Sequence, residues 1–174
     1  MTIIQQSQTR SIFLYIFFLA LFPVISVFIM QFGFDLKPCV LCHYQRYPYF
    51  LILFLSLCVL IFNVTDHKFV FIAFMVCVLC FFITAFIGFF HVGVEHHWWE
   101  GTAECAGRIN IKLSPQEFIL QLTQQPIVRC DEVAWSFLGI SLAGYNFLYG
   151  SCCGIGLLYF GIKKEYVTHD HKSQ

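Results

Sequence analysis

Charged side chains are scarce in this chain. Only 11% of its 174 residues are Asp, Glu, Lys or Arg, and ten basic and ten acidic residues cancel to a formal net charge of zero. A soluble domain of this size carries roughly twice that charged fraction. The absence of excess positive charge also argues against a nucleic-acid partner. By contrast, 59% of the residues are hydrophobic, among them 22 phenylalanines.

Charge is missing altogether from four stretches: residues 11–34, 47–65, 69–94 and 133–162. Each can hold the roughly 20 apolar residues that cross a bilayer core. Buried helices of a soluble protein are the alternative, but so short a chain has too little polar surface to cover four of them. Because lipid offers no hydrogen bonds, each span must be a helix. In the last stretch, Gly150 and Gly154 form a GxxxG, which favours close helix packing.

The sequence therefore predicts an all-α membrane protein, a four-helix transmembrane bundle that forms a single domain over residues 1–174. We expect spans at about 12–31, 47–64, 69–91 and 143–162. An even number of spans puts both termini on one side and two loops, about 32–46 and 92–142, on the other. Basic residues are denser on the short terminal side, which favours a cytoplasmic location for both termini. The two loops would then lie on the opposite, non-cytoplasmic side of the membrane.

The long loop carries a helix signal of its own. Ser114-Pro115-Gln116-Glu117 has the S-x-x-E spacing of a capping box, with Pro at the first helical position. Phe118, Ile119 and Leu122 follow on one face. The pattern predicts a short amphipathic helix on the membrane surface. A turn of ordinary soluble helix would show the same pattern.

Nine cysteines divide by position. Five fall inside the predicted spans: Cys58, Cys77, Cys80, Cys152 and Cys153. The other four fall in the two loops of one side, as a pair in each: Cys39, Cys42, Cys105 and Cys130. The thiolate is the reactive form of cysteine, and hydrocarbon disfavours charge. We therefore expect Cys77 and Cys80, although they form a CxxC, to be apolar packing residues.

Cys39-Val40-Leu41-Cys42 repeats the letters of Cys77–Cys80 in another setting. Pro38 precedes it, and a helix is expected to begin just after it. Free N–H groups and the helix dipole at such a terminus favour the thiolate. Arg46 follows Cys42 by four residues, so the two side chains share a face if the helix begins by Cys42. That cation would stabilise a Cys42 thiolate.

Metal-binding interpretations of these cysteines are weaker. Cys39-Val40-Leu41-Cys42-His43 matches the C-x-x-C-H pattern of c-type haem attachment, with an axial ligand available from His91, His96 or His97. A motif pressed against a membrane helix has little chain with which to enclose a porphyrin. A Cys₄ zinc site needs closely paired cysteines, and the two in the long loop are 25 residues apart. We therefore expect no metal.

A purely structural disulfide suits one pair better than the other. Between Cys105 and Cys130, loop closure would contribute roughly 3–4 kcal/mol. The CxxC closes a tiny ring and gains little in this way. Two dithiol pairs on one membrane face instead suggest a relay by thiol–disulfide exchange. One pair would meet a soluble partner, and the other would meet a lipid-soluble acceptor at the bilayer surface.

These motifs resemble the disulfide bond formation protein B (DsbB) family over nearly the whole chain. The residues that carry the resemblance are Lys37-Pro38-Cys39-Val40-Leu41-Cys42 with Gln45-Arg46, Glu95-His96, Cys105, Cys130, and Trp135-Ser136-Phe137-Leu138-Gly139. The resemblance implies a disulfide-generating protein-dithiol:quinone oxidoreductase. Its partner would be a periplasmic thioredoxin-fold oxidase of the DsbA kind, and its acceptor ubiquinone or menaquinone.

The resemblance also implies two redox disulfides, Cys39–Cys42 and Cys105–Cys130. Reduced partner would attack the second disulfide at Cys105. Cys130 would then attack Cys39 and free Cys42 as a thiolate beside the quinone. Electrons from Cys42 would reduce the quinone, and the first disulfide would form again.

Two quinone-binding residues are implied as well, Arg46 and His96, which match family positions near the head group. His91 and His97 are the alternatives to His96 for this contact. A quinone carbonyl gains negative charge on reduction, and a cation or N–H donor aimed at it stabilises the product. The nearest rival is a thiol–quinone enzyme of the vitamin K epoxide reductase kind, whose cysteine order fits less well. A non-catalytic membrane scaffold with stabilising disulfides is the rival from another class.

Overall fold

The computed structural model describes residues 3–103, 105 and 128–170 of the chain. Four helices account for most of them: α1 (Ile3–Gly33), α2 (Val40–Ile61), α3 (His67–Glu95) and α5 (Leu142–Asp170). A small hairpin of β1 (Ser136–Phe137) and β2 (Ile140–Ser141) leads directly into α5. The predicted all-α class is thus confirmed for the described residues, apart from this hairpin. The predicted amphipathic helix near Ser114 lies outside them.

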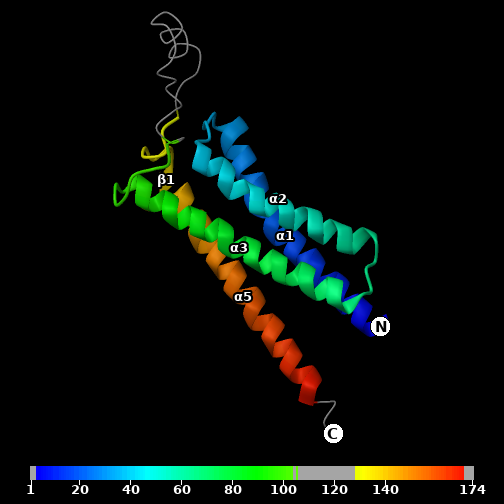
Figure 1. Cartoon of the computed structure of the whole chain (residues 1–174). Coiled ribbons are helices and arrows are strands. Elements are labelled where there is room, and N and C mark those ends of the chain that lie inside the picture. The colour runs from blue at the N-terminus through cyan, green and yellow to red at the C-terminus, as the bar shows by residue number, and fades with distance from the viewer. Residues whose placement is uncertain (1–2, 104, 106–127, 171–174) are drawn as a thin grey trace, which may run out of the picture.

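The helices run alternately in opposite directions, so that α1 begins and α5 ends at the same end of the bundle (Figure 1). The first helix packs on α2, α2 on α3, and α3 on α5. The opposite end of the bundle gathers the α1–α2 turn, the end of α3 and the hairpin. Segments that carry cysteines far apart in sequence therefore meet at this end.

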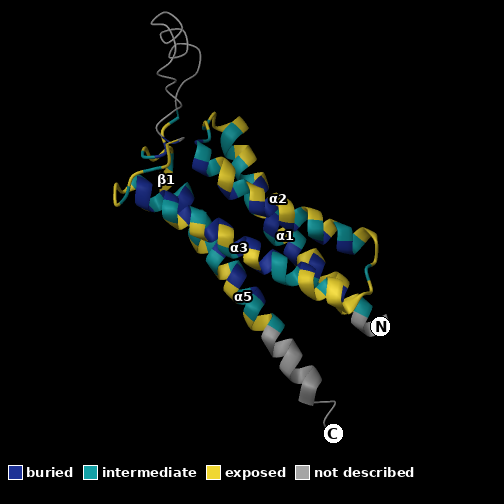
Figure 2. Ribbon diagram, in the orientation of Figure 1, coloured by how far each residue is buried: buried dark blue, intermediate teal, exposed yellow. Residues whose placement is uncertain are grey.

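Three helices of the described chain are long and apolar enough to cross a membrane: Gln6–Gly33, Val40–Ile61 and His67–Glu95. Large side chains such as Phe18, Phe54 and Phe86 are exposed on them, and Figure 2 shows such exposure along the outer faces of the bundle. Lipid would cover these surfaces. The fourth helix, α5, is less apolar because Asn146 and several tyrosines interrupt it. Its crossing of the membrane stays a prediction.

The helices α1, α2 and α3 share a core of buried side chains, including Phe13, Ile52 and Phe81. Both Cys77 and Cys80 belong to this core, with 0% and 4% of their surface exposed. This buried position agrees with the expectation that Cys77 and Cys80 serve as apolar packing residues. Small residues bring α3 and α5 together: a Cβ added to Gly150 would lie 2.9 Å from the Phe81 carbonyl oxygen.

Proline interrupts α1 at a point where another helix compensates. Pro23 has no N–H to donate to the carbonyl of Leu19, one turn earlier in α1. The hydroxyl of Tyr149 in α5 donates to that carbonyl at 2.8 Å. The freed backbone acceptor is therefore satisfied by a side chain of α5, as a lipid-embedded helix requires. This bond also ties α1 to α5 at the level of the cavity described below.

The second helix begins earlier than the predicted span. Its first residue is Val40, and the segment that joins it to α1 is only residues 34–39. A left-handed residue, Asp35 with φ 52°, turns the chain there. The CxxC is thus the first turn of α2, and the expected sharing of a face by Cys42 and Arg46 follows. The first loop is shorter than the expected 32–46 for the same reason.

Candidate functional site

The four cysteines of the predicted loops meet in one cluster. Cys39, Cys105 and Cys130 are all buried, and Cys42 packs against them. The cluster is sealed by apolar neighbours that include Leu41, Val94 and Trp99. These cysteines come from the start of α2 and from two places in the long loop. Tertiary packing, rather than local sequence, brings the two pairs together.

The sulfurs of the cluster form a chain of contacts. The thiol of Cys105 interacts with that of Cys130, and the thiol of Cys130 interacts with that of Cys39. The thiol of Cys39 donates in turn to Sγ of Cys42, at 3.2 Å. Burial raises the pKa of Cys105, and the bond to Cys39 together with burial raises that of Cys130. Both thiols therefore favour the protonated form, and the sulfur contacts lead from Cys105 to Cys42.

Cys39 occupies the N-cap of α2. Its sulfur accepts a hydrogen bond from the backbone N–H of Cys42 at 3.4 Å. The hydrogen bond from Cys130 lowers the pKa of Cys39, but the bond donated to Cys42 and burial outweigh it and raise the pKa to about 12. Negative charge is therefore better placed on Cys42, one turn before Arg46. The first turn of α2 adds its free N–H groups to the same effect.

Arg46 is held beside Cys42 by contacts with α1. Its Nη1 donates to Oε1 of Gln31 at 2.7 Å, and its guanidinium lies 5.7 Å from the centre of the Phe28 ring. The buried Nε has no hydrogen-bond partner among the described residues. A buried donor without a partner is costly, so a ligand acceptor at this point would be favoured.

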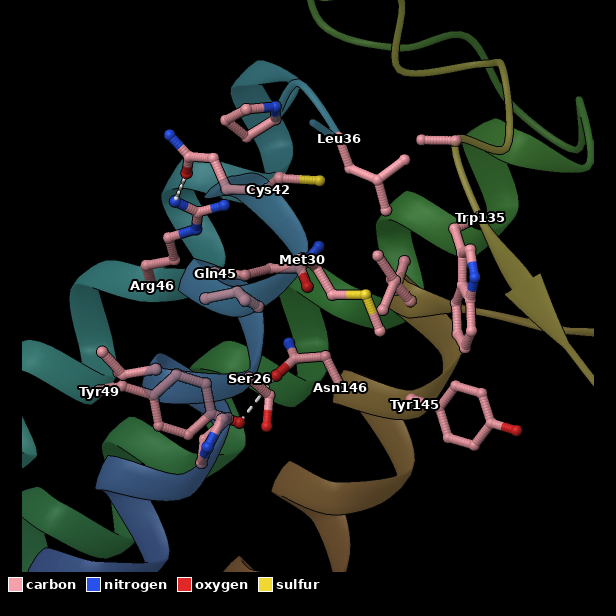
Figure 3. Close-up of a pocket in the computed structure, with 18 of the residues that line it drawn as sticks. Ser26, Met30, Leu36, Cys42, Gln45, Arg46, Tyr49, Trp135, Tyr145 and Asn146 are labelled. Atoms are coloured by element: carbon pink, nitrogen blue, oxygen red, sulfur yellow. Dashed lines mark hydrogen bonds between the residues drawn. The ribbon is translucent and has the colours of Figure 1, made fainter. Parts of the chain in front are cut away.

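A cavity of about 380 Å³ opens beside these two residues (Figure 3). Its walls come from α1, the first turns of α2 and α5, and the segment that precedes the hairpin. Most lining side chains are apolar, and a few polar ones converge on it: Gln31, Cys42, Gln45, Arg46, Tyr49 and Asn146. An apolar cavity with a few placed polar groups is typical of small-molecule sites. A flat, weakly polar ring with a carbonyl directed at Arg46 fits this lining.

One wall of the cavity is fixed by a buried polar network across three helices. Tyr49 donates to Oδ1 of Asn146 at 2.7 Å, and Nδ2 of Asn146 donates to Oγ1 of Thr84 at 3.0 Å. Thr84 donates to the backbone carbonyl of Gln45 at 2.9 Å. The network joins α2, α3 and α5, so it holds the cavity in shape without using Cys42 or Arg46.

A second cavity, of about 800 Å³, adjoins the cluster at Cys105. Cys105 lines it, together with polar residues such as Glu100, Arg129 and Asp131. Arg129 and Asp131 form an exposed ion pair there. The sulfur chain therefore has two ends: Cys105 faces a polar cavity, and Cys42 faces an apolar one.

His91 is, from the sequence alone, a possible haem ligand and an alternative to His96 at the quinone. It is 3% exposed, and its Nε2 lies 3.6 Å from Sγ of Cys39. Its Nδ1 lies 2.9 Å from Nε2 of Gln45, and Glu95 approaches Nε2 at 3.9 Å. The sequence did contain a sign of its importance: His91 is an ionisable residue within a predicted membrane span that has no charged residue. Such a residue is a functional candidate.

His96 is not brought to the cavity, in contrast to the expectation from the resemblance. It is exposed, stacks on Trp98 with ring centres 5.3 Å apart, and is absent from the described residues that line the cavity of Cys42. The reason is the end of α3. His96 is the C-cap of α3, and the left-handed His97, with φ 56°, ends the helix directly after it.

Comparison with known proteins gives a family match and a relative of similar length. The family described as "Disulfide bond formation protein DsbB" matches residues 9–160. A protein of Rickettsia prowazekii (strain Madrid E), described as "Uncharacterized protein RP370", is 30% identical over 161 residues, which cover 90% of this chain and 91% of that protein. No solved structure matches the chain.

Proposed function

The chain belongs to the disulfide bond formation protein DsbB family, and from this premise we propose that it moves electrons from a protein dithiol to a membrane quinone. The donor would be a periplasmic thioredoxin-fold oxidase of the DsbA kind. The acceptor would be ubiquinone or menaquinone. The observation that carries the proposal is the sulfur chain that joins Cys105, on a polar cavity, to Cys42, on an apolar one.

Electrons enter at Cys105. A thiolate of the reduced partner attacks Sγ of Cys105 in the Cys105–Cys130 disulfide, and Cys130 leaves as a thiolate. The second partner thiol attacks its own sulfur in the mixed disulfide, so the partner leaves oxidised and this pair is reduced. The polar cavity beside Cys105 supports access by a partner from water.

Electrons leave at Cys42. The thiolate of Cys130 attacks Sγ of Cys39 in the Cys39–Cys42 disulfide, and the released Cys42 thiolate lies one turn from Arg46. Cys105 then attacks Sγ of Cys130 in the Cys39–Cys130 mixed disulfide and releases Cys39, so the Cys105–Cys130 disulfide forms again. Cys39 and Cys42 would then re-form their disulfide as two electrons pass to a bound quinone, which takes up two protons and leaves as a quinol. Arg46 stabilises negative charge on Cys42 and on an acceptor oxygen. The buried network around Asn146 keeps the cavity walls in place.

We place the four cysteines on the periplasmic side of the inner membrane and both termini in the cytoplasm. Disulfides persist in the periplasm, which supports that orientation. An impermeant thiol reagent, applied to intact cells after mild reduction, should label Cys105. It should not label a cysteine introduced in the tail after Lys163. The reverse pattern would contradict the orientation.

Turnover by the purified chain in detergent tests the function itself. Reduced DsbA-like protein and a short-chain quinone should together give loss of quinone absorbance and oxidised partner in equal amounts. Cys105→Ser and Cys42→Ser should each abolish it, at the two ends of the relay. A stable scaffold would give no turnover with any quinone, and that result would sink the proposal.

A further inference from the structure

We propose that the reduced protein binds a thiophilic divalent cation of the Zn²⁺ class through Cys39, Cys42 and His91. The two sulfurs and one imidazole nitrogen of these residues lie within 4.8 Å of one another. Sγ of Cys39 is 3.2 Å from Sγ of Cys42 and 3.6 Å from Nε2 of His91. The zinc interpretation of the sequence considered the long-loop pair and not this group, because His91 is 52 residues from Cys39.

The spacing suits tetrahedral coordination. Zinc bonds of about 2.3 Å to sulfur and 2.0–2.1 Å to nitrogen put two sulfur ligands roughly 3.8 Å apart, and sulfur and nitrogen roughly 3.5 Å apart. The sulfurs therefore need to separate by only about half an ångström, and the 3.6 Å between Sγ of Cys39 and Nε2 of His91 already matches the expected sulfur–nitrogen distance. The fourth position is open to water or to Sγ of Cys130, which contacts Cys39.

The surroundings of His91 also suit a ligand. A metal-bound imidazole usually donates its other N–H to a neighbouring acceptor. The amide of Gln45 lies at Nδ1 of His91, at 2.9 Å. Rotation of that amide presents Oε1 to an Nδ1–H and leaves the lone pair of Nε2 for the cation. Two thiolates cancel the charge of the cation, so the buried complex is neutral, as a buried site requires.

Binding depends on redox state. Two thiols lose two protons as two sulfur–metal bonds form, and no electron is transferred. When Cys39 and Cys42 are joined in a disulfide they offer no thiolate, so the oxidised protein should not bind. The binding itself goes beyond the proposed function. One consequence rests on that function: the bound cation holds both sulfurs and stops exchange with Cys130.

Titration with Co²⁺ tests the site on the full chain in detergent. The phosphine-reduced protein should develop thiolate-to-cobalt charge-transfer absorption, and Zn²⁺ should displace it. Gln45→Leu should weaken binding by roughly 10–100-fold, and His91→Ala by at least as much. The pair Cys77→Ala and Cys80→Ala, in the other CxxC, is the matched control and should leave binding unchanged. Equal binding by oxidised protein, or by His91→Ala, would overturn the proposal.

X-ray absorption at the zinc edge covers the case in which His91→Ala does not fold. Unaltered reduced protein loaded with Zn²⁺ should show imidazole scattering and at least two sulfurs at about 2.3 Å. Zinc with no imidazole overturns the site. Neither readout needs turnover, so failure of quinone reduction and failure of metal binding are separate results. Metal-free protein that turns over but binds no cobalt contradicts this proposal alone.

Discussion

Nε2 of His91 lies 3.6 Å from Sγ of Cys39, while Nδ1 of the same ring lies 2.9 Å from the amide nitrogen of Gln45. A hydrogen bond from Gln45 to Nδ1 leaves the ring proton on Nε2, directed at the sulfur. Cys39 is the leaving sulfur when Cys105 resolves a mixed disulfide between Cys39 and Cys130. Negative charge on that sulfur is stabilised by the Nε2–H.

His91→Ala should therefore slow resolution of the Cys39–Cys130 mixed disulfide. A hydrogen bond to a charged group contributes about 1.5–3 kcal/mol, which corresponds to a rate loss of roughly 10- to 150-fold. Rapid acid quenching and non-reducing gels measure the rate. His96→Ala is the matched control, because His96 is exposed and away from the sulfurs. Slow resolution in His96→Ala with normal resolution in His91→Ala would reverse the assignment of the two histidines.

Arg46→Ala should weaken use of the quinone and spare exchange with the partner. Arg46 lines the apolar cavity, whereas the partner's entry point at Cys105 lies on the other cavity. The main effect should be a raised quinone KM, with some loss of kcat where the cation steadies developing charge. Arg46→Lys should restore only part of the quinone activity, because a point charge cannot reproduce the paired N–H donors of the guanidinium. Unchanged quinone kinetics in Arg46→Ala would remove the residue from the site.

Cys77→Ala combined with Cys80→Ala should leave turnover nearly intact. Both residues are buried in the helix core, and Cys77 lies 14 residues before His91, or about 21 Å along the helix. The cost should instead appear in stability, at about 1 kcal/mol for each lost thiol. Unfolding in detergent and quinone reduction together measure the two effects. Lost turnover in a folded double variant would mean that the wrong CxxC has been chosen.

Tyr149→Phe should destabilise the protein by about 1–3 kcal/mol, because the Leu19 carbonyl freed by Pro23 loses its donor. In a Pro23→Ala background the backbone N–H of residue 23 returns to that carbonyl. The same Tyr149→Phe change should then cost less, with a coupling of at least roughly 0.5 kcal/mol. Chemical unfolding of the four proteins of this cycle gives the coupling. Additive costs would show that the two residues act independently.

The chemistry carried by local spacing is predictable from the sequence. Cys39, Cys42 and Arg46 lie on the first two turns of one helix, so their relation follows from helix geometry. The first residue of that helix is harder to predict from the sequence. An uncharged stretch marks where the lipid begins, and the helix can begin before that point. The uncharged stretch begins only after Arg46, whereas the helix begins six residues earlier, at Val40.

Contacts between segments far apart in the sequence cannot be predicted from residue spacing. The meeting of Cys39 with His91 joins the start of α2 to the end of α3, and it depends on how the two helices cross. The placement of His96 depends on where the helix ends, which the left-handed His97 marks. Spacing alone cannot separate two histidines five residues apart, and both were reasonable neighbours of the cysteines. Only their backbone settings distinguish them.

The order of the relay gives the most demanding prediction. Sulfur contacts run from Cys105 through Cys130 and Cys39 to Cys42, and Cys39 donates its proton to Cys42, so Cys42 should carry the thiolate and Cys39 should exchange. Cys39→Ser should keep a Cys42 thiolate that gives a charge-transfer band with bound quinone. Cys42→Ser should lose the band, yet still trap Cys39 in a disulfide with Cys130.

The two variants are matched, because each removes one sulfur of the same pair and leaves an oxygen in its place. The absorption band reports the sulfur that faces the apolar cavity, and the trapped disulfide reports the sulfur that faces Cys130. Cys42 lines that cavity, and Cys39 is the sulfur that contacts Cys130. A band in Cys42→Ser that is missing from Cys39→Ser would exchange the two roles. The hydrogen-bond direction would then have no bearing on electron flow, because the charge would sit on the sulfur with the raised pKa.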